Sequence, residues 1–515
     1  MNYNVLTESW IPARLPDGSI REYGVLDLLE HAHELVEITD AMPNYEFGMY
    51  RFLFVFLMDA YHPKRQRDIR ALLEEGSFDM ELIRGYVEEC NRDGERFDLL
   101  DETHPFMQQA EGWDRKAEVK SIAKLNPAMP SGSNHVHFEH TFEADAELSL
   151  SQAAKALTAI NVFAGCDGKG YQAALSASAS GTCIPVYTIV KGDNLFETLV
   201  FGLSSSLMDE DYYSDDTKKD FPIWRNDSYQ NYEEYPHAIV FKLFGLTFPV
   251  RYVRLNYSND TLRSINWASG LKYKYKDKTA NGSELTISWK DPYVSYKYDT
   301  KGLRVAVASK LDDRNWLDIG SIFNVYEQTL NEQPLKPTAP EVVVAYQELQ
   351  RPLINVCTYT CFNRAGKGDI YDIKRNEYIF SNKIMGSNML FEFFLNVGLG
   401  TVKKYGEKLE KALISVQVAV LHIKKKEENL KKTVYAAERT RTLNRYYSDT
   451  YHQVMEYLCP VLEKSQMSEL GELQEEWNHR ISAIQTENYN EFVDRISVNS
   501  RLYFEIEKAR KEKDS

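Results

Sequence analysis

The order of apolar and polar positions predicts a mixed succession of helices and strands in the first part of the chain. Residues 44–61 are almost continuously apolar, over a length that favours a helix buried on nearly all sides. Residues 68–90 show the periodicity of two amphipathic helices, and Ser149 or Ser151 is a plausible N-cap for a helix over residues 149–163. Residues 2–12 predict a short opening strand that ends at a proline.

Strand composition dominates the middle of the chain. Strands are predicted over residues 183–190, 237–244, 249–257, 284–289, 293–298, 303–308 and 341–347, with a helix over residues 194–207. Several of these segments alternate apolar and polar residues, which is typical of strands with one buried face.

Helical periodicity takes over beyond about residue 382. Leu413, Val416 and Val420 recur at i, i+3 and i+7, and breaks are expected near Pro460 and Gly471. We therefore predict an α+β fold, in which a mixed domain of antiparallel strands and helices occupies residues 1–381. A four-helix bundle is expected over residues 382–515.

Composition and charge limit the classes of function. With 515 residues and 43% hydrophobic positions, the chain can bury the cores of two or more domains. Signal-peptide and membrane-spanning patterns are absent, so we expect a soluble, cytoplasmic protein without membrane contacts. The six scattered cysteines favour neither a disulfide framework nor structural zinc. A net charge of −15 excludes the broad basic surface of an autonomous nucleic-acid-binding protein, which leaves only local patches for such contacts.

Two polar loops on either side of the helix at 149–163 carry the candidate chemistry. The first, residues 131–140 (SGSNHVHFEH), contains His135, His137 and His140, a spacing that a metal-dependent hydrolase could use. The nearby acidic residues form no familiar ligand set, so hydrogen bonding or stacking is the alternative. The second, residues 165–170 (GCDGKG), lacks a phosphate-binding fingerprint. Its glycines could let another molecule approach the backbone closely, or could simply end a helix.

Basic residues gather in two places. Lys272, Lys274, Lys276 and Lys278 alternate with other residues, which would place them on one face of a strand, as for a phosphate backbone or a protected edge strand. Between residues 424 and 445, eight basic residues face three acidic ones. That excess could follow a nucleic-acid strand or could be the solvated face of a helix. We identify no motif for a catalytic site.

Several segments together resemble a known family. They are residues 4–12 (NVLTESWIP, similar to NLLTEPWIP in that family), 104–108 (HPFMQ), the Ser131-Gly132 loop with Phe138, 180–182 (SGT), 220–224 (DFPIW) and 246–255 (LTFPVRYVRL). Their order and spacing resemble the large subunit, the CasA family, of the type I-E CRISPR Cascade complex.

The resemblance implies a non-catalytic DNA-binding subunit without cofactor or metal, which recognises the protospacer-adjacent motif in double-stranded target DNA. It would assist strand opening and R-loop formation, and recruit the helicase-nuclease effector for antiviral defence. Its partners would be the guide RNA handle and the backbone and small subunits of Cascade. In RNA-guided recognition, base pairing with the guide reads the sequence while the protein reads only the short motif.

The resemblance also assigns DNA-binding residues position by position. Phe138 matches the loop aromatic of the family, and His140 stands where the family commonly has an asparagine. The glycine loop of the family corresponds to Gly165, Gly168, Lys169 and Gly170, and its inserted lysine to Lys272 or Lys274. The β-hairpin wedge of the family falls near residues 363–369, where no glutamine occurs and Asn363, Arg364 or Lys367 could replace it. In the bundle the candidates are Lys424, Lys425, Lys426, Lys431 and Lys432.

Two other classes remain open. One is a metal-dependent hydrolase that uses His135, His137 and His140, and the other is a scaffold that contacts only proteins. Metal content and duplex binding distinguish them from a DNA-recognition subunit.

Overall fold

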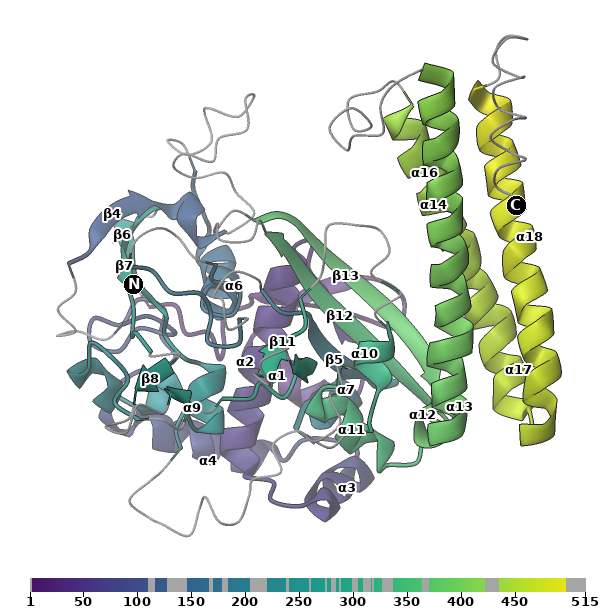
Figure 1. Ribbon diagram of the computed structural model, residues 1–515. Helices are drawn as coiled ribbons and strands as arrows, with labels where there is room; N and C mark the ends of the chain where they lie inside the picture. Colours follow the sequence, from purple (N-terminus) through teal and green to yellow (C-terminus); the bar gives the residue numbers. More distant parts are fainter. Residues whose placement is uncertain are drawn as a thin grey trace. The chain divides into compact units, whose positions relative to one another are not determined.

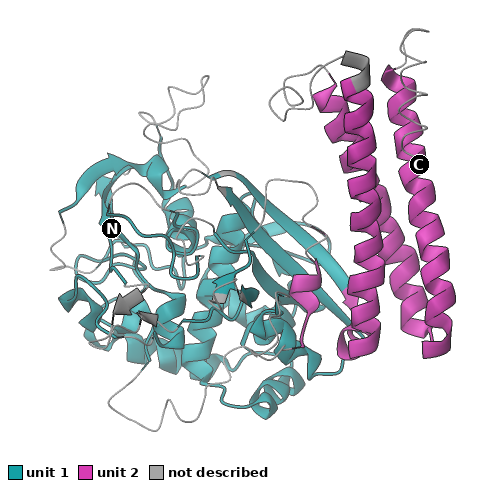
Figure 2. Cartoon of the chain, in the orientation of Figure 1, with its two compact units in different colours: residues 1–310, 327–379 teal, residues 311–326, 380–515 magenta. Residues whose placement is uncertain are grey.

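The computed structural model forms two compact units (Figures 1 and 2). Unit 1 comprises residues 1–310 and 327–379, and unit 2 comprises residues 311–326 and 380–515. The structure describes residues 2–109, 116–126, 146–165, 170–177, 184–203, 220–237, 240–258, 261–273, 276–278, 284–286, 289–298, 304–308, 316, 319–326, 337–363, 370–421 and 435–496.

Helix α2 (Pro43–Tyr61) lies at the centre of unit 1, and every residue from Asn44 to Asp59 is buried. This confirms the predicted helix that is buried on all sides. Its aromatic rings meet a different neighbour on each face: Phe47 stacks on Tyr187 at 4.6 Å, and Phe52 contacts Phe106 edge-on at 5.1 Å. At Gly48 a side chain would meet the backbone of α6 (Leu150–Ile160), so glycine permits the close approach of these two helices.

Three buried charges of α2 bind three segments that are distant in sequence. The ion pairs are Glu46 with Arg375 at 2.7 Å, Arg51 with Asp291 at 2.7 Å and Asp59 with Arg225 at 3.1 Å. Burial raises the pKa of both Glu46 and Asp59, although their arginine partners oppose the shift. Because an unpaired buried charge costs several kcal/mol, roughly 3–5 when one partner is removed, each pair fixes its segment against the helix.

Short antiparallel sheets surround this helix (Figure 1). The first contains β1 (Ile11–Arg14), β2 (Ile20–Tyr23) and β3 (Glu37–Ile38) in the order β2-β1-β3, and the second contains β5 (Tyr187–Lys191), β12 (Leu353–Asn363) and β13 (Ile370–Ser381) in the order β13-β12-β5. The third contains β4 (Glu118–Ser121), β6 (Arg251–Ser258) and β7 (Thr261–Ser269) in the order β4-β7-β6. The two-stranded ribbons are β8 (Lys276–Lys278) with β9 (Glu284–Thr286) and β10 (Tyr296–Tyr298) with β11 (Arg304–Ala306).

The remaining helices of unit 1 are short. They are α1 (Val25–Glu30), α3 (Gln66–Glu75), α4 (Met80–Cys90), α7 (Leu195–Leu203), α9 (Lys242–Leu246) and α11 (Glu341–Gln347). The predicted pair of helices within residues 68–90 corresponds to α3 and α4. Ser149 caps α6 as expected, since its hydroxyl accepts the Gln152 amide at 3.1 Å.

Three strand predictions were wrong. Residues 242–246 form α9, because the buried carboxylate of Asp220 accepts the amides of Leu243 at 2.7 Å and Phe244 at 3.0 Å and so satisfies the start of a helix. Residues 341–347 form α11, in which burial of Val342, Val343 and Tyr346 outweighs the strand preference of valine. In the opening segment the strand begins only at Ile11, since the preceding residues turn around the carbonyl of Asn4.

The HPFMQ segment and the residue after it cover the outer edge of β6. The side-chain oxygen of Gln109 accepts the Val253 amide at 2.6 Å, and its nitrogen donates to the Arg251 carbonyl at 3.1 Å. The side-chain oxygen of Gln108 accepts the Leu255 amide at 2.8 Å. These amides replace a neighbouring strand and hold β6, which carries the candidate site, in place.

Unit 2 is a helical region that contains several long helices, as predicted. It comprises α10 (Ile319–Phe323), α12 (Asn382–Gly386), α13 (Asn388–Phe393), α14 (Gly400–Leu421), α16 (Ala436–Gln453), α17 (Cys459–Lys464) and α18 (Leu470–Ile496). Leu413 and Val416 are buried, as their spacing indicated, and Phe492 and Ile496 of α18 are buried as well. The buried indole of Trp477 on α18 donates to the Gly398 carbonyl at 3.0 Å.

The predicted break at Pro460 is wrong. The helical run continues from α16 through a π-helical segment, Val454–Leu458, into α17, and Pro460 occupies the first turn of α17. A proline at that position removes an amide that the altered hydrogen-bond ladder can spare. The run ends instead at Ser465, and Gly471 lies in the first turn of α18. Among the described helices, none combines the length and apolar character that a bilayer crossing requires.

Asp220 provides a test of the capping arrangement of α9. Burial raises the pKa of this carboxyl to about 6, against the two backbone hydrogen bonds, which lower it. A raised pKa in the folded state means that protonation favours folding below about pH 4, and that this contribution is lost as pH rises through 6. The free energy of unfolding of the wild type minus that of Asp220→Asn should therefore fall by about 2 kcal/mol between pH 4 and pH 7, as measured by urea unfolding at each pH.

Asp227→Asn is the matched control for this experiment. Burial raises the pKa of Asp227, but the hydrogen bonds and charge of Arg96 outweigh it and lower the pKa overall. The corresponding difference should stay constant above pH 5 and shrink only under more acidic conditions. A pH-independent difference for Asp220→Asn would contradict the assigned burial and capping.

Candidate nucleic-acid interface

Three of the predicted DNA-binding residues, Gly165, Gly170 and Lys272, lie in the described part of the chain. The others lie outside it: Phe138, His140, Gly168, Lys169, Lys274, Arg364, Lys367, Lys424, Lys425, Lys426, Lys431 and Lys432. His135 and His137 of the alternative metal site lie outside it as well.

The glycine turn and the Lys272 segment are joined by hydrogen bonds. The side-chain amide of Gln172 donates to the Tyr273 carbonyl and accepts the Tyr273 amide, both at 2.7 Å. The hydroxyl of Tyr273 donates to the Ala173 carbonyl at 3.2 Å. Gly170 has φ +94°, a conformation that favours glycine. Two segments about a hundred residues apart in the sequence thus form one local structure.

Arg251 connects both stems of the glycine turn to β6. Its guanidinium donates to the carbonyls of Gly165 and Gln172, the latter at 2.5 Å, and to that of Val250 at 3.0 Å. The same group lies 5.3 Å from the ring centroid of Tyr171. Arg251 is only 2% exposed, so this contact is buried within the structure.

The sequence carries a signal for this role of Arg251, in the alternation of buried and exposed positions along β6. On β6, Arg251 has the same strand parity as the buried residues Val253 and Leu255. An arginine on the inward-facing side of a predicted strand needs buried acceptors, and the carbonyls of a glycine turn supply them. Gln172 and Tyr273 gave no comparable signal, because their pairing depends on tertiary contact.

Lys272 is held at its backbone but remains exposed at its charged end. Its backbone amide donates to the Glu233 carbonyl at 3.1 Å, and its ammonium group pairs with the Glu233 carboxylate at 2.8 Å. The two side chains are 39% and 73% exposed. A solvent-exposed pair contributes little to stability, so a phosphate group could replace the carboxylate as partner.

Ser176 lies shortly before residues 178–183, which include the SGT motif, and it belongs to a buried polar cluster. The Ser176 hydroxyl donates to the Asp291 carboxylate at 2.5 Å and accepts the indole N–H of Trp289 at 3.1 Å. The same carboxylate oxygen binds Arg51 of α2. This stem is therefore tied to the central helix.

A hairpin occupies the region that the resemblance assigned to the wedge. It consists of β12 and β13, and the six residues that connect them, 364–369, lie outside the described part. Arg375 of β13 contacts Glu46 at 2.7 Å, Glu37 at 2.8 Å and Glu377 at 2.6 Å. Lys191 pairs with Glu37 and Glu377 at 2.6 Å each. This ionic network fixes the hairpin to α2 and to β3.

Basic residues of unit 2 divide into paired and exposed groups. Lys403, Lys404, Lys408 and Lys411 are exposed on α14, and none has an ion-pair partner among the described carboxylates. We call these four residues the α14 lysine face. On α16, by contrast, Arg439 donates to Gln417 at 2.9 Å and Arg445 pairs with Glu491. Of the eight basic residues between 424 and 445, the structure describes Arg439, Arg441 and Arg445, and two of these three thus have structural contacts.

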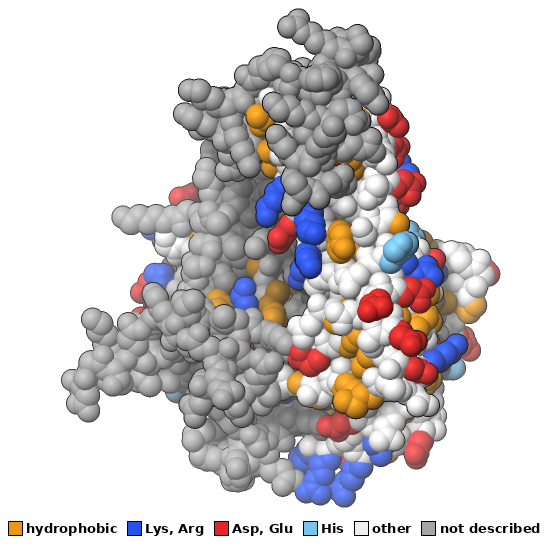
Figure 3. Space-filling model, turned by 45° about the vertical axis from the view of Figure 1, so that its right-hand side comes forward, with side chains coloured by type: hydrophobic (Ala, Val, Ile, Leu, Met, Phe, Trp, Pro, Cys, Tyr) orange, Lys and Arg blue, Asp and Glu red, His pale blue; other side chains and the backbone are white. Residues whose placement is uncertain are grey.

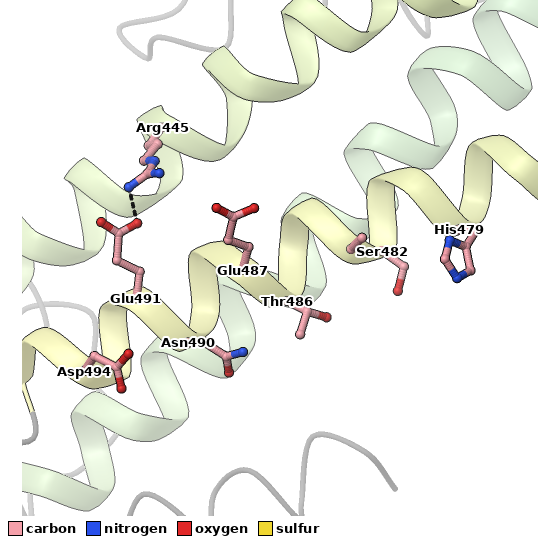
Figure 4. A pocket seen from close by; sticks show the side chains of 9 residues that line it. Arg445, His479, Ser482, Thr486, Glu487, Asn490, Glu491 and Asp494 are labelled. Atoms are coloured by element: carbon pink, nitrogen blue, oxygen red, sulfur yellow. Dashed lines mark hydrogen bonds and ion pairs between the residues drawn. The ribbon is translucent and has the colours of Figure 1, made fainter.

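The groove beside Arg445 is acidic and does not suit a phosphate. Figure 4 shows Glu487, Glu491 and Asp494 of α18 along it, with Arg445 directed at Glu491. On the face of the molecule in Figure 3, cations and carboxylates are interspersed, and cations gather only in small groups. Contacts with nucleic acid through these surfaces would be local, in agreement with the negative net charge.

The described residues contain no group of three or more His, Cys, Asp or Glu side chains that could hold a metal ion. Cys357 and Cys361, which are four residues apart, are buried free thiols on β12. Burial raises the pKa of Cys357 to about 12, so this thiol stays protonated at neutral pH.

The fold is shared with several solved structures. CasA of Thermus thermophilus matches with a TM-score of 0.71 and 20% identity, over 100% of this chain and 99% of that chain. Thermobifida fusca Cse1 matches with a TM-score of 0.72 and 18% identity, over 99% and 97% of the two chains. A chain of a CRISPR RNA-guided surveillance complex matches with a TM-score of 0.71 and 15% identity, over 100% of both chains.

Sequence comparison provides the family. No curated protein sequence matches the chain significantly. The sequence profile of CRISPR-associated protein Cse1, however, matches residues 4–487, which is nearly the whole chain. The chain therefore belongs to the family of CRISPR-associated protein Cse1.

Proposed function

We propose that this protein is the large, non-catalytic subunit of a CRISPR RNA-guided surveillance complex. It recognises the protospacer-adjacent motif in double-stranded DNA, assists strand opening and recruits the helicase-nuclease. The observation that carries the proposal is the set of hydrogen bonds that joins the stems of the glycine turn, the Lys272 segment and Arg251, in a member of the Cse1 family. The fold is also that of a chain within a surveillance complex.

The glycine turn suits recognition through the backbone. Glycines let main-chain groups come close to a ligand, and the minor groove offers a shallow and degenerate pattern of acceptors and donors. Lys272, whose exposed ammonium group can exchange Glu233 for a phosphate, would position the duplex without reading bases. This combination favours tolerance of several motifs.

The anchored hairpin supports a role in strand separation. A segment that enters a duplex must resist displacement, and the network of Arg375 and Lys191 with three carboxylates ties β13 to the body of unit 1. Arg364 and Lys367 would act from the connection of this hairpin. The α14 lysine face, together with Lys424–Lys426, Lys431 and Lys432, would hold the displaced strand.

Bulk at the glycine turn should weaken motif recognition. In the assembled complex, Gly168→Val should raise the Kd for a motif-bearing duplex by about tenfold, because a β-branched side chain keeps the backbone away from the groove. Gly85→Val is the control, since Gly85 lies in α4 with no atom near its missing side chain and should change the Kd less than about twofold. Equal affinity of Gly168→Val and the wild type would contradict the proposal.

Removal of charge from the α14 lysine face should flatten the salt dependence of single-strand binding. Replacement of Lys404, Lys408 and Lys411 by Gln should reduce the slope of log K against log salt by about 2, at about 0.7 for each lost phosphate contact. The control replaces Arg445, Lys464 and Arg480 by Gln, which changes the net charge equally. If both triple variants reduced the slope of log K against log salt equally, a general effect of net charge would explain the result. The α14 lysine face would then have no contact with the single strand.

A metal-dependent hydrolase remains the second candidate, because His135, His137 and His140 have a spacing that suits metal ligation. Elemental analysis of the purified protein and of His137→Ala separates the two functions. We expect less than stoichiometric metal in both proteins. Stoichiometric metal in the wild type that is lost in His137→Ala would favour the hydrolase.

A further inference from the structure

Arg251 occupies an unusual place for a strand arginine. It lies in the interior, at 2% exposure, and directs its donors at backbone carbonyls from both stems of the glycine turn. Backbone carbonyls are fixed by the path of the chain, so the guanidinium sets the separation of Gly165 from Gln172. Its planar fork makes this possible, because its donors point in fixed directions.

The surroundings make this geometry rigid. The guanidinium packs near the rings of Tyr171, at 5.3 Å, and Trp267, at 5.9 Å. The backbone amide of Arg251 donates to the Asn161 side chain at 3.0 Å, just beyond the end of α6. The carbonyl of Arg251 accepts from Gln109. Strand, helix end and turn are therefore joined at one residue.

A second connection runs from the same turn to the exposed lysine. Arg251 holds the carbonyl of Gln172, and the side chain of Gln172 pairs with Tyr273, the neighbour of Lys272. A displacement of the guanidinium would shift the glycine turn directly and the Lys272 segment through Gln172.

We propose that Arg251 is a positioning residue for motif recognition, which holds the stems of the glycine turn at Gly165 and Gln172 and, through Gln172, the Lys272 segment. It does not contact DNA itself, because its guanidinium is buried beneath the turn stems. The inference rests on the proposed function and adds a residue to it. Lysine cannot replace arginine here, since a single ammonium group cannot reach both stems in the fixed directions of the fork.

The experiment compares two affinities in the assembled complex, one for a duplex that carries the motif and one for a duplex that lacks it. The readout is their ratio, the motif discrimination. A variant that only lowers the fraction of folded protein reduces binding of both duplexes alike and leaves the ratio unchanged. For Arg251→Lys we expect discrimination to fall by about tenfold, the loss that accompanies a misplaced recognition contact.

Arg96→Lys is the matched control. Arg96 is also a buried arginine of unit 1, at 9% exposure, but both its terminal nitrogens bind Asp227 at 2.8 Å. Loss of this fork should destabilise the protein without changing motif discrimination. An equal fall in discrimination in both variants would overturn the proposal, because it would reflect general loosening of the unit.

Tyr171→Leu covers the case in which Arg251→Lys fails to assemble. This half-buried ring packs on the guanidinium, and its removal should lower discrimination in the same direction but less strongly. Unchanged discrimination in a folded Arg251→Lys complex, or in Tyr171→Leu if the first variant does not assemble, would overturn the proposal. If wild-type discrimination were itself near one, the proposed function would fail instead, so the two failures are distinguishable.

Discussion

The need to neutralise charge inside unit 1 is the constraint on which its architecture depends. A helix that is buried on every side places any charged residue in a medium where an unpaired ion is costly, and α2 carries three of them. Each one is paired with a residue from a different distant segment. Arg375, the partner of Glu46, fixes the hairpin of β12 and β13, and Asp291, the partner of Arg51, also binds Ser176, which precedes residues 178–183. The same ion pairs thus stabilise the buried helix and hold two of the segments that pack against it.

Under the proposed function, the buried arginines hold the segments that would take part in recognition. A turn that reads DNA through its backbone has no side chains to adjust its fit, so its stems must be held accurately. The carbonyls of Gly165 and Gln172 are fixed by Arg251, and the hairpin of β12 and β13 by Arg375. In both cases an arginine binds several acceptors at once, which a lysine would do with less directional control.

Sequence reasoning was most successful where burial alone determines structure. The apolar run of α2 and the spacing of Leu413 and Val416 predicted their helices and their burial, since these patterns arise from contact with a core. It was wrong at residues 237–244 and 341–347, where valine and aromatic content resembles a strand. The deciding factor in the first of these is the capping carboxylate of Asp220, twenty-three residues before Leu243. No local pattern contains such a contact.

The candidate site shows the same limit. Its glycines and Lys272 could be selected from the sequence, because residue type alone suggests backbone access and phosphate affinity. Their connection through Gln172 and Tyr273 could not, since hydrogen bonds between side chain and backbone carry no periodicity. Arg251 lies between these cases. Its parity on β6 predicts an inward side chain, but its acceptors, such as the carbonyl of Gly165, become evident only from the tertiary structure.

Whether a cation is available for contact with a nucleic acid depends on the carboxylate with which it is already paired. A cation with a buried or bidentate carboxylate partner cannot leave it without a large cost. Arg375, Arg225 and Arg96 are of this kind and hold the fold together. Lys272 and the α14 lysine face are exposed, so their ammonium groups could pair with a phosphate with little loss of stability. An acidic total charge is thus compatible with local cationic patches, because the cations of the internal pairs, which include Arg375 and Lys191, are distinct from the exposed lysines.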